Sequence, residues 1–370
     1  MPNAKSNDRT TSVDFIRTAA LIGICIVNLP YLGLPIENTF AVPALPADQI
    51  ATILVQTLFE AKFFLLFSFL FGWGFAIQMQ SAARAEASFS ARYFRRLAGL
   101  ALFGCLHAIF VFSGDILLLY AVLGLFLWPL RDATPDRLMR LALWMIPLSL
   151  VTLATLGLLV GTGLILPSAN ALGGGFIEAT KARLTDWMPT FGFLVLFQAP
   201  LAFGAFLCGL AAAKSGFFAA GSQGRADLAR AFPWLLGFGL AGNLVLALAP
   251  PDHDILSLLA LMGTAVAAPV LAAAWLHLLL IAGDRVRLPE ILIRSGQNSL
   301  SAYLLQGILA GFVFGAYGLD LFDHLGQAML LVTAPVIALT AMLLAGLLAR
   351  PTGRAPFEAL LRRLTYGMTA

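Results

Sequence analysis

The chain has 370 residues, of which 60% are hydrophobic and only 11% are charged, and its mean hydropathy is +0.88. Soluble domains carry about 25% charged residues, so a soluble globular protein is excluded. The net charge of +4 does not indicate nucleic acid as a partner, because the basic residues lie in short segments between apolar runs, where they set membrane topology. We predict an all-α fold, a polytopic integral membrane helical bundle whose partner is the lipid bilayer.

A helix needs about 20 apolar residues to cross the hydrocarbon core of a bilayer. Runs that approach this length predict about ten transmembrane helices, in chain order over residues 15–33, 52–80, 95–112, 115–130, 138–166, 190–213, 230–249, 256–282, 296–317 and 327–349. The fourth run is short. The second run can also be interpreted as an interfacial segment followed by a span that starts near Lys62.

The basic residues predict the orientation of these helices. With the N-terminus inside, only Lys181 and Arg183 fall in outer loops and Lys62 lies within or at the edge of a span, while all the other Lys and Arg residues fall in inner segments. Short loops rich in Lys and Arg stay on the cytoplasmic side. We therefore expect both termini to be cytoplasmic and the membrane to be the bacterial cytoplasmic (inner) membrane.

The chain is interpreted as a single membrane domain, residues 1–370, in four parts. Residues 1–131 carry most of the sequence motifs, residues 132–290 form the middle helices, and residues 291–349 form the last two helices. The segment 350–370 is a cytoplasmic tail that contains a short amphipathic helix. We expect that helix to lie on the inner membrane surface, with its arginines toward anionic headgroups.

Polar residues inside the predicted spans share one depth. His107 follows Arg96 by eleven residues, which places it about 16 Å from the inner edge, and Asn28 stands at the same distance from Arg17. Ionisable groups at such depth are costly and tend to face the interior of the bundle. We predict a polar cavity open to the outer side, formed by Asn28, Glu60, Lys62, His107, Asp115, Asn243 and Gln306.

Each of these residues also has a structural interpretation. Asp115 can cap the fourth helix, and the amides of Asn28, Asn243 and Gln306 can join helices by hydrogen bonds. Glu60 and Lys62 are two residues apart, so they do not face each other on a helix; Lys62 can instead snorkel to the interface. His107 can be a structural core histidine.

Other chemistry is not supported by the motifs. Asp14 and Arg17, at i and i+3, predict an ion pair at the inner edge of the first helix. No spacing matches a zinc motif, so we expect no metal and no bound cofactor. A P-loop, a Rossmann fingerprint, GxSxG and HExxH are absent from any credible context, which disfavours ATP-driven transport and hydrolysis of the soluble type.

Several motifs in order along almost the whole chain resemble the YeiB-like family, also called domain of unknown function 418. They are Val13-Asp14-Phe15-Ile16-Arg17 with Asn28, Glu60-Ala61-Lys62-Phe63, Leu106-His107 with Ser113-Gly114-Asp115, Gly296-Gln297-Asn298-Ser299-Leu300, Tyr303-Leu304-Leu305-Gln306 and Pro356-Phe357-Glu358. The family's first helices are in turn similar to those of transmembrane acyltransferases. Those enzymes carry their catalytic histidine early in the bundle, whereas no histidine precedes His107 here.

The resemblance implies a membrane acyltransferase that takes an acyl group from a cytoplasmic donor, with acyl-CoA as co-substrate, to a sugar, lipid or small-molecule acceptor at the outer face. In that interpretation His107 is the general base and Asp115 orients it. Asn28, Lys62 or Gln306 stabilises the oxyanion, and Asp14 and Arg17 lie on the donor side. Two alternatives remain open: a transporter or flippase of a small polar solute or lipid, and a non-catalytic membrane protein.

Overall fold

The computed structural model describes residues 4–162, 173–219, 221–249 and 255–367, and every regular element in these ranges is helical. The longer helices are α1 (Ala4–Gly33), α4 (Lys62–Arg84), α5 (Phe89–Phe110), α7 (Pro135–Gly161), α8 (Phe176–Lys214), α9 (Gln223–Ala247), α10 (Ile255–Arg285) and α13 (Gln327–Leu348). The shorter elements are α2 (Ile36–Phe40), α3 (Pro46–Leu58), α6 (Leu117–Leu127) with its 3-10 turn η1 (Trp128–Leu130), α11 (Glu290–Gln297), α12 (Ser299–Phe314) and α14 (Pro356–Tyr366).

The prediction of a multi-pass membrane bundle is confirmed. Within the described ranges, eight helical segments are long and apolar enough to cross a membrane. Two shorter apolar helices, over Leu117–Leu130 and Ser299–Phe314, occupy the fourth and ninth predicted spans. The second predicted span is interrupted between α3 and α4, where Ala61 adopts a left-handed φ of 63°. The alternative of a span that starts near Lys62 therefore describes this segment better than one continuous helix.

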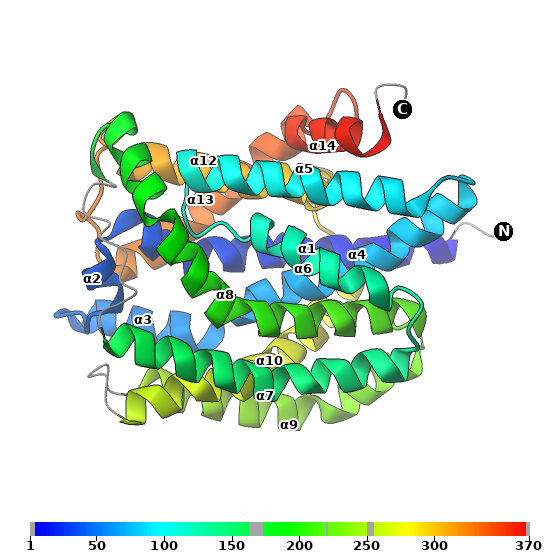
Figure 1. Cartoon of the computed structure of the whole chain (residues 1–370), viewed down its shortest axis with the longest axis horizontal. Helices are drawn as coiled ribbons and strands as arrows, with labels where there is room; N and C mark the ends of the chain where they lie inside the picture. The colour runs from blue at the N-terminus through cyan, green and yellow to red at the C-terminus, as the bar shows by residue number, and fades with distance from the viewer. Residues whose placement is uncertain (1–3, 163–172, 220, 250–254, 368–370) are drawn as a thin grey trace.

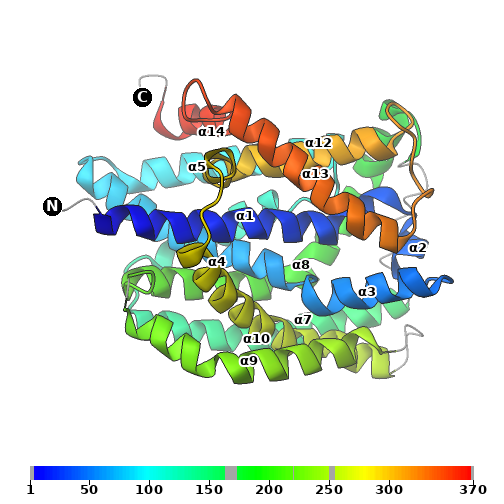
Figure 2. The ribbon, with the colours of Figure 1, turned by 180° about the vertical axis from the view of Figure 1, so that it is seen from behind.

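The helices run mostly along one axis of the molecule (Figure 1). Both chain ends lie at the same end of the bundle, here called the terminal end, and α2 lies at the opposite end. Helices α5, α12 and α14 form one side, α7 and α9 form the other, and α1 and α4 lie between them. From behind, α13 crosses α1 and α12 obliquely (Figure 2).

Glycines allow the central helices α4 and α8 to approach closely. A Cβ added at Gly72 would lie 2.0 Å from the carbonyl oxygen of Phe206, and one added at Gly209 would lie 1.9 Å from that of Phe69. Small residues at such crossings let two helix backbones touch, which is how helices associate where lipid removes the hydrophobic driving force. The reciprocal pair fixes α8 against α4 and so positions the N-terminal part of α8 at the opposite end.

The predicted amphipathic tail helix is present as α14, but its buried face packs on protein. Leu361 is 4% exposed and contacts α5 at Gly99. The carboxylate of Glu358 accepts hydrogen bonds from the backbone N–H of Ser301 (2.9 Å) and from its hydroxyl, so α14 caps the start of α12. Burial raises the pKa of the Glu358 carboxyl above its ordinary value. The tail is therefore part of the bundle, which corrects the expectation that it only rests on the membrane surface.

Candidate functional site

The chain returns against α5 so that Asp115 meets His107. After α5 ends at Phe110, residues 111–116 turn back and α6 begins at Leu117. A Cβ added at Gly104 would lie 2.5 Å from the backbone nitrogen of Leu118 and 2.9 Å from the Asp115 carboxylate. Only glycine at this position leaves room for the returning chain one helical turn below the histidine. The sequence thus brings together two ionisable groups that are eight residues apart.

His107 and Asp115 form a buried hydrogen-bonded dyad. The distance between His107 Nδ1 and Asp115 Oδ2 is 2.8 Å, and the residues are 4% and 2% exposed. A carboxylate can only accept, so we assign the proton of the neutral imidazole to Nδ1. The other carboxylate oxygen, Oδ1, accepts from the backbone N–H of Leu117 at 2.7 Å. Asp115 therefore both caps α6 and orients the imidazole. The two roles predicted for it are compatible.

A third group, Tyr303 of α12, completes the dyad. Its hydroxyl donates to Asp115 Oδ2 at 3.1 Å, and its ring lies 5.3 Å from the His107 ring between centroids. Tyr303 lies in one of the family motifs, but no role was predicted for it from the sequence. Its spacing from Gln306, i and i+3 on one helix face, was the signal that could have found it.

The second ring nitrogen of His107 faces a small cavity. Nε2 is buried and has no hydrogen-bond partner among the described residues. A Cβ added at Gly307 would lie only 2.5 Å from Nε2, so the imidazole lies directly against α12. Buried polar atoms are nearly always hydrogen-bonded, and an exception asks for an explanation.

The cavity is lined by residues of α1, α5 and α12, among them Asn28, His107, Tyr303 and Gln306. Its volume of about 20 Å³ leaves room for about one water molecule. Gln306 also donates to the carbonyl of Leu21 at 3.2 Å. Four of the seven residues predicted to share a cavity, including Asp115 behind the histidine, therefore lie together.

Glu60 and Lys62 lie elsewhere, at the break between α3 and α4. The Lys62 ammonium is buried and donates to the backbone carbonyl of Gln56 at 2.7 Å. Glu60 interacts electrostatically with Lys62 and with Tyr31. Neither residue lines the His107 cavity, which corrects the prediction of one shared site. The helix break is the reason, because Lys62 binds a backbone carbonyl, that of Gln56, which the break leaves free.

Asn243 is also separate from the cavity. Its amide donates to the carbonyls of Gly239 on its own helix α9 and of Ala267 on α10, both at 2.8 Å. Equal depth along the bundle axis led to its inclusion in the predicted cavity. Depth does not report position around the axis, and α9 lies on the side of the bundle away from α5 (Figure 1).

The predicted Asp14–Arg17 ion pair is present toward the terminal end. Arg17 Nη1 lies 3.0 Å from Asp14 Oδ1, and the side chain of Gln297 donates to Asp14 Oδ2 at 2.9 Å. Arg17 also lies over the ring of Trp73, 5.9 Å from its centroid. The pair ties α1 to α11 and lies on α1 between the His107 cavity and the chain's N-terminus.

The fold and the site together define this protein as a multi-pass helical bundle that contains a buried His–Asp dyad. Residues 212–368 match the profile of DUF418, described as a protein of unknown function. The chain is 28% identical to the uncharacterized protein YxaH of Bacillus subtilis (strain 168), over 98% of this chain and 95% of that one. It is 33% identical to the uncharacterized protein YeiB of Escherichia coli (strain K12), over 34% of this chain and 32% of that one.

An uncharacterized 39.9 kDa protein in the amylase 3' region of Bacillus acidopullulyticus is 35% identical, over 33% of this chain and 34% of that one. These matches support the YeiB-like DUF418 family that the motifs predicted. No solved structure matches it. None of the three relatives is named for an activity, so the function is argued from the site.

Proposed function

We propose that this protein is a membrane acyltransferase in which His107 is the general base. The observation that carries the proposal is the buried dyad whose free nitrogen, Nε2, faces a cavity. A histidine held at Nδ1 by a carboxylate has its Nε2 lone pair available to take a proton. The three groups around the carboxylate, namely His107, the Leu117 N–H and the Tyr303 hydroxyl, hold it in the orientation that this role requires.

In the proposed reaction, Nε2 takes the proton of an acceptor hydroxyl while the oxygen attacks the carbonyl carbon of an acyl thioester. The carbon–sulfur bond then breaks, and the proton passes from the imidazolium to the departing thiolate. Asp115 stabilises the imidazolium in between. Asn28, which lines the same cavity, is placed to donate its amide N–H to the developing oxyanion. Lys62 has no part in this scheme, because it does not line the cavity.

The topology of the proposal follows from charge. Arginines and lysines gather in the loops of the terminal end, which we assign to the cytoplasm of a bacterium by the positive-inside rule. The donor, proposed to be acyl-CoA, would then approach from that end, where Arg17 and Arg96 lie close to each other. Along α5 the distance from Arg96 to His107 is about 16 Å, which the acyl-bearing arm of the donor would have to span. A sugar, lipid or small molecule would serve as the acceptor from the opposite side.

The test uses the purified full-length chain in vesicles of phosphatidylethanolamine and phosphatidylglycerol, with radiolabelled acetyl-CoA or palmitoyl-CoA. We expect transfer of label to an acceptor, and a loss of about 10²–10⁴-fold in His107→Ala. His277→Ala is the matched control, since that ring packs at a tilt against Phe232 with 4.7 Å between centroids and lies outside the cavity. If His107→Ala transfers label as fast as the wild type, the proposed mechanism is wrong.

One observation favours a second candidate function, proton-coupled transport. The break between α3 and α4 places Glu60 and Lys62 at an interrupted helix, and interrupted helices carry the substrate and ion sites of many transporters. The freed carbonyl of Leu58 is bound by the indole N–H of Trp275 at 2.9 Å, which keeps the break intact. Proton-driven solute uptake that Lys62→Met abolishes and His107→Ala leaves unchanged would favour transport over acyl transfer.

A further inference from the structure

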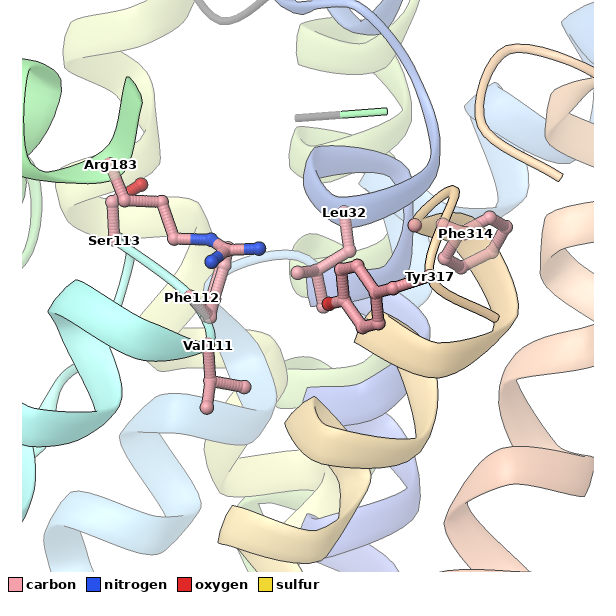
Figure 3. Close-up of a pocket in the computed structure, with 9 residues that line it drawn as sticks. Leu32, Val111, Phe112, Ser113, Arg183, Phe314 and Tyr317 are labelled. Carbon is pink, nitrogen blue, oxygen red and sulfur yellow. The ribbon is translucent and has the colours of Figure 1, made fainter. Parts of the chain in front are cut away.

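A buried arginine lies in a second pocket beside the dyad cavity. Arg183 of α8 is 4% exposed, and Figure 3 shows its guanidinium directed across the pocket toward Tyr317. The pocket is lined by residues of α1, α8 and α12 and by the segments that follow α5 and α12. From the sequence, Arg183 was predicted only as an outer-loop charge, because sequence alone does not show that α8 extends over the end of α5.

The charge of Arg183 is not neutralised by any residue that the structure describes. Its Nη1 donates to the backbone carbonyl of Phe110 at 3.0 Å, and it interacts with the phenol of Tyr317. None of the ion pairs formed by the described residues includes Arg183. Both of its partners are uncharged, whereas a buried charge is normally paired with an opposite one or bound to a ligand. The guanidinium has five N–H donors in a planar fork, so several remain for a ligand.

The two pockets adjoin each other. Leu32 and Phe112 line both, and Ser113 of the arginine pocket stands two residues before Asp115. A ligand held at Arg183 therefore lies in the pocket next to the cavity that His107 lines. This arrangement places the fixed positive charge of Arg183 near the His107 nitrogen that takes the proton of the acceptor in the proposed reaction.

We infer that Arg183 and Tyr317 bind the phosphate or carboxylate of an anionic acceptor, whose hydroxyl group then lies at His107. The inference rests on the proposed function for the role of His107, and it deepens that function by naming the class of acceptor. The planar fork of arginine matches both oxyanions with two parallel hydrogen bonds. Such an anion is carried equally by a lipid headgroup or by a soluble metabolite, and the probes below distinguish these sources.

Binding is measured by calorimetry on the full-length chain in phosphatidylcholine nanodiscs, with no acyl donor present. The probes share a glycerol unit: glycerol 3-phosphate, glycerate, short-chain phosphatidylglycerol and neutral glycerol. We expect at least one anionic probe to bind the wild type more tightly than glycerol does. Arg183→Gln should weaken that binding about 10- to 100-fold, the range expected for hydrogen bonds to a charged group. Lys181→Gln makes the same charge change on an exposed residue of the same helix and should leave binding unchanged.

Two milder variants guard against a failure of Arg183→Gln to fold. Arg183→Lys keeps the charge but loses the fork, and Tyr317→Phe removes only one hydroxyl, so both should weaken binding of the anionic probe. The inference is overturned if no anionic probe binds better than glycerol, or if these variants bind as the wild type does.

His107→Ala separates the two proposals, because it should lose acyl transfer and keep the binding of the anion. Loss of transfer in His107→Ala together with unchanged anion binding in the Arg183 variants would overturn only the anion site. Anion binding that depends on Arg183, together with unimpaired transfer in His107→Ala, would overturn only the catalytic proposal.

Discussion

Asn243 on α9 and His107 on α5 are both almost fully buried polar residues in apolar helices, but their hydrogen bonds differ. The amide N–H groups of Asn243 reach two backbone carbonyls, one on its own helix and one on α10. The imidazole of His107 is held at one nitrogen by Asp115, and its other nitrogen has no partner among the described residues and lies beside a cavity. The first arrangement holds two helices together, whereas the second leaves a reactive atom available.

Burial and depth therefore do not by themselves distinguish a functional polar residue from a structural one. Interhelical hydrogen bonds in membranes contribute about 0.6 kcal/mol on average, which is enough to explain Asn243. An unpartnered buried nitrogen lowers stability, since a missing bond costs about 1–3 kcal/mol. In our proposal the fold tolerates this loss of stability at His107 because the substrate supplies the hydrogen-bond partner that Nε2 lacks.

The largest expected effect is that of Asp115→Asn. An asparagine can hydrogen-bond either nitrogen of the imidazole and no longer fixes the proton on Nδ1, so Nε2 loses its role as a base. In serine proteases the equivalent change lowers the turnover rate about 10⁴-fold. We expect a loss of acyl transfer of that order, measured as transfer of label from acyl-CoA. If the folded variant transfers label within a few-fold of the wild-type rate, the dyad has a structural role, as Asn243 does.

A smaller effect is expected from Gly307→Ala. The added methyl group would lie 2.5 Å from Nε2, which is closer than van der Waals contact allows, so the imidazole must shift from the position in which it accepts the proton. We expect transfer to fall at least about tenfold, which corresponds to 1.4 kcal/mol of barrier. Gly237→Ala is the control, because nothing lies within 4 Å of a Cβ at that exposed position. Equal rates for the two variants would show that the cavity is not the acceptor site.

Asn243→Ala should change stability and leave the chemistry alone. It removes both amide hydrogen bonds of Asn243, one of which joins α9 to α10, and we expect a loss of about 0.6–1.7 kcal/mol in the free energy of unfolding. The measurement is denaturant unfolding in detergent, with acyl transfer assayed on the folded protein. A variant that keeps its stability but loses transfer would return Asn243 to the functional site.

Glu358 provides a third buried polar site, and its expected effect is the smallest. Its folded-state pKa is raised by burial above the ordinary value of 4.5. The stability that this shift contributes is therefore fully present below the unfolded pKa and is lost as pH rises through the folded pKa. Compared with Glu358→Gln, the wild type should lose stability as pH rises from about 4.5, measured by thermal unfolding across pH. A constant difference between the two proteins would contradict the assignment, and transfer should not follow this titration.

The sequence predicted most of the fold, because membrane-spanning helices are selected by composition and length. The interruption before Lys62 was one of two interpretations of the second run, since nothing in the apolar run marks a left-handed residue at Ala61 that would decide between them. The packing of α14 on the bundle was not predicted from the sequence, because an amphipathic face does not indicate whether lipid or protein covers it. In both places the structure depends on contacts with distant segments, the indole of Trp275 in one case and the hydroxyl of Ser301 in the other.

The candidate site was predictable only in part. His107 and Asp115 are close in sequence and flank one turn, so their contact could be inferred. Gln306 and Asn28 were placed by depth and happen to lie on helices that adjoin α5, whereas Asn243 shares the depth and not the position. Arg183 escaped detection because its burial depends on α8 continuing past the end of α5.

The contact between Glu358 and α12 has a consequence for how the chain is made. The carboxylate that caps α12 is synthesised 57 residues after Ser301, whose N–H it accepts. At 5–20 residues per second, roughly 3–11 s of translation separate the two. During that interval α12, which carries Tyr303, Gln306 and Gly307, exists in the membrane with an incomplete first turn. A chain terminated before Glu358 would have inserted every apolar helix and would still lack this cap on α12.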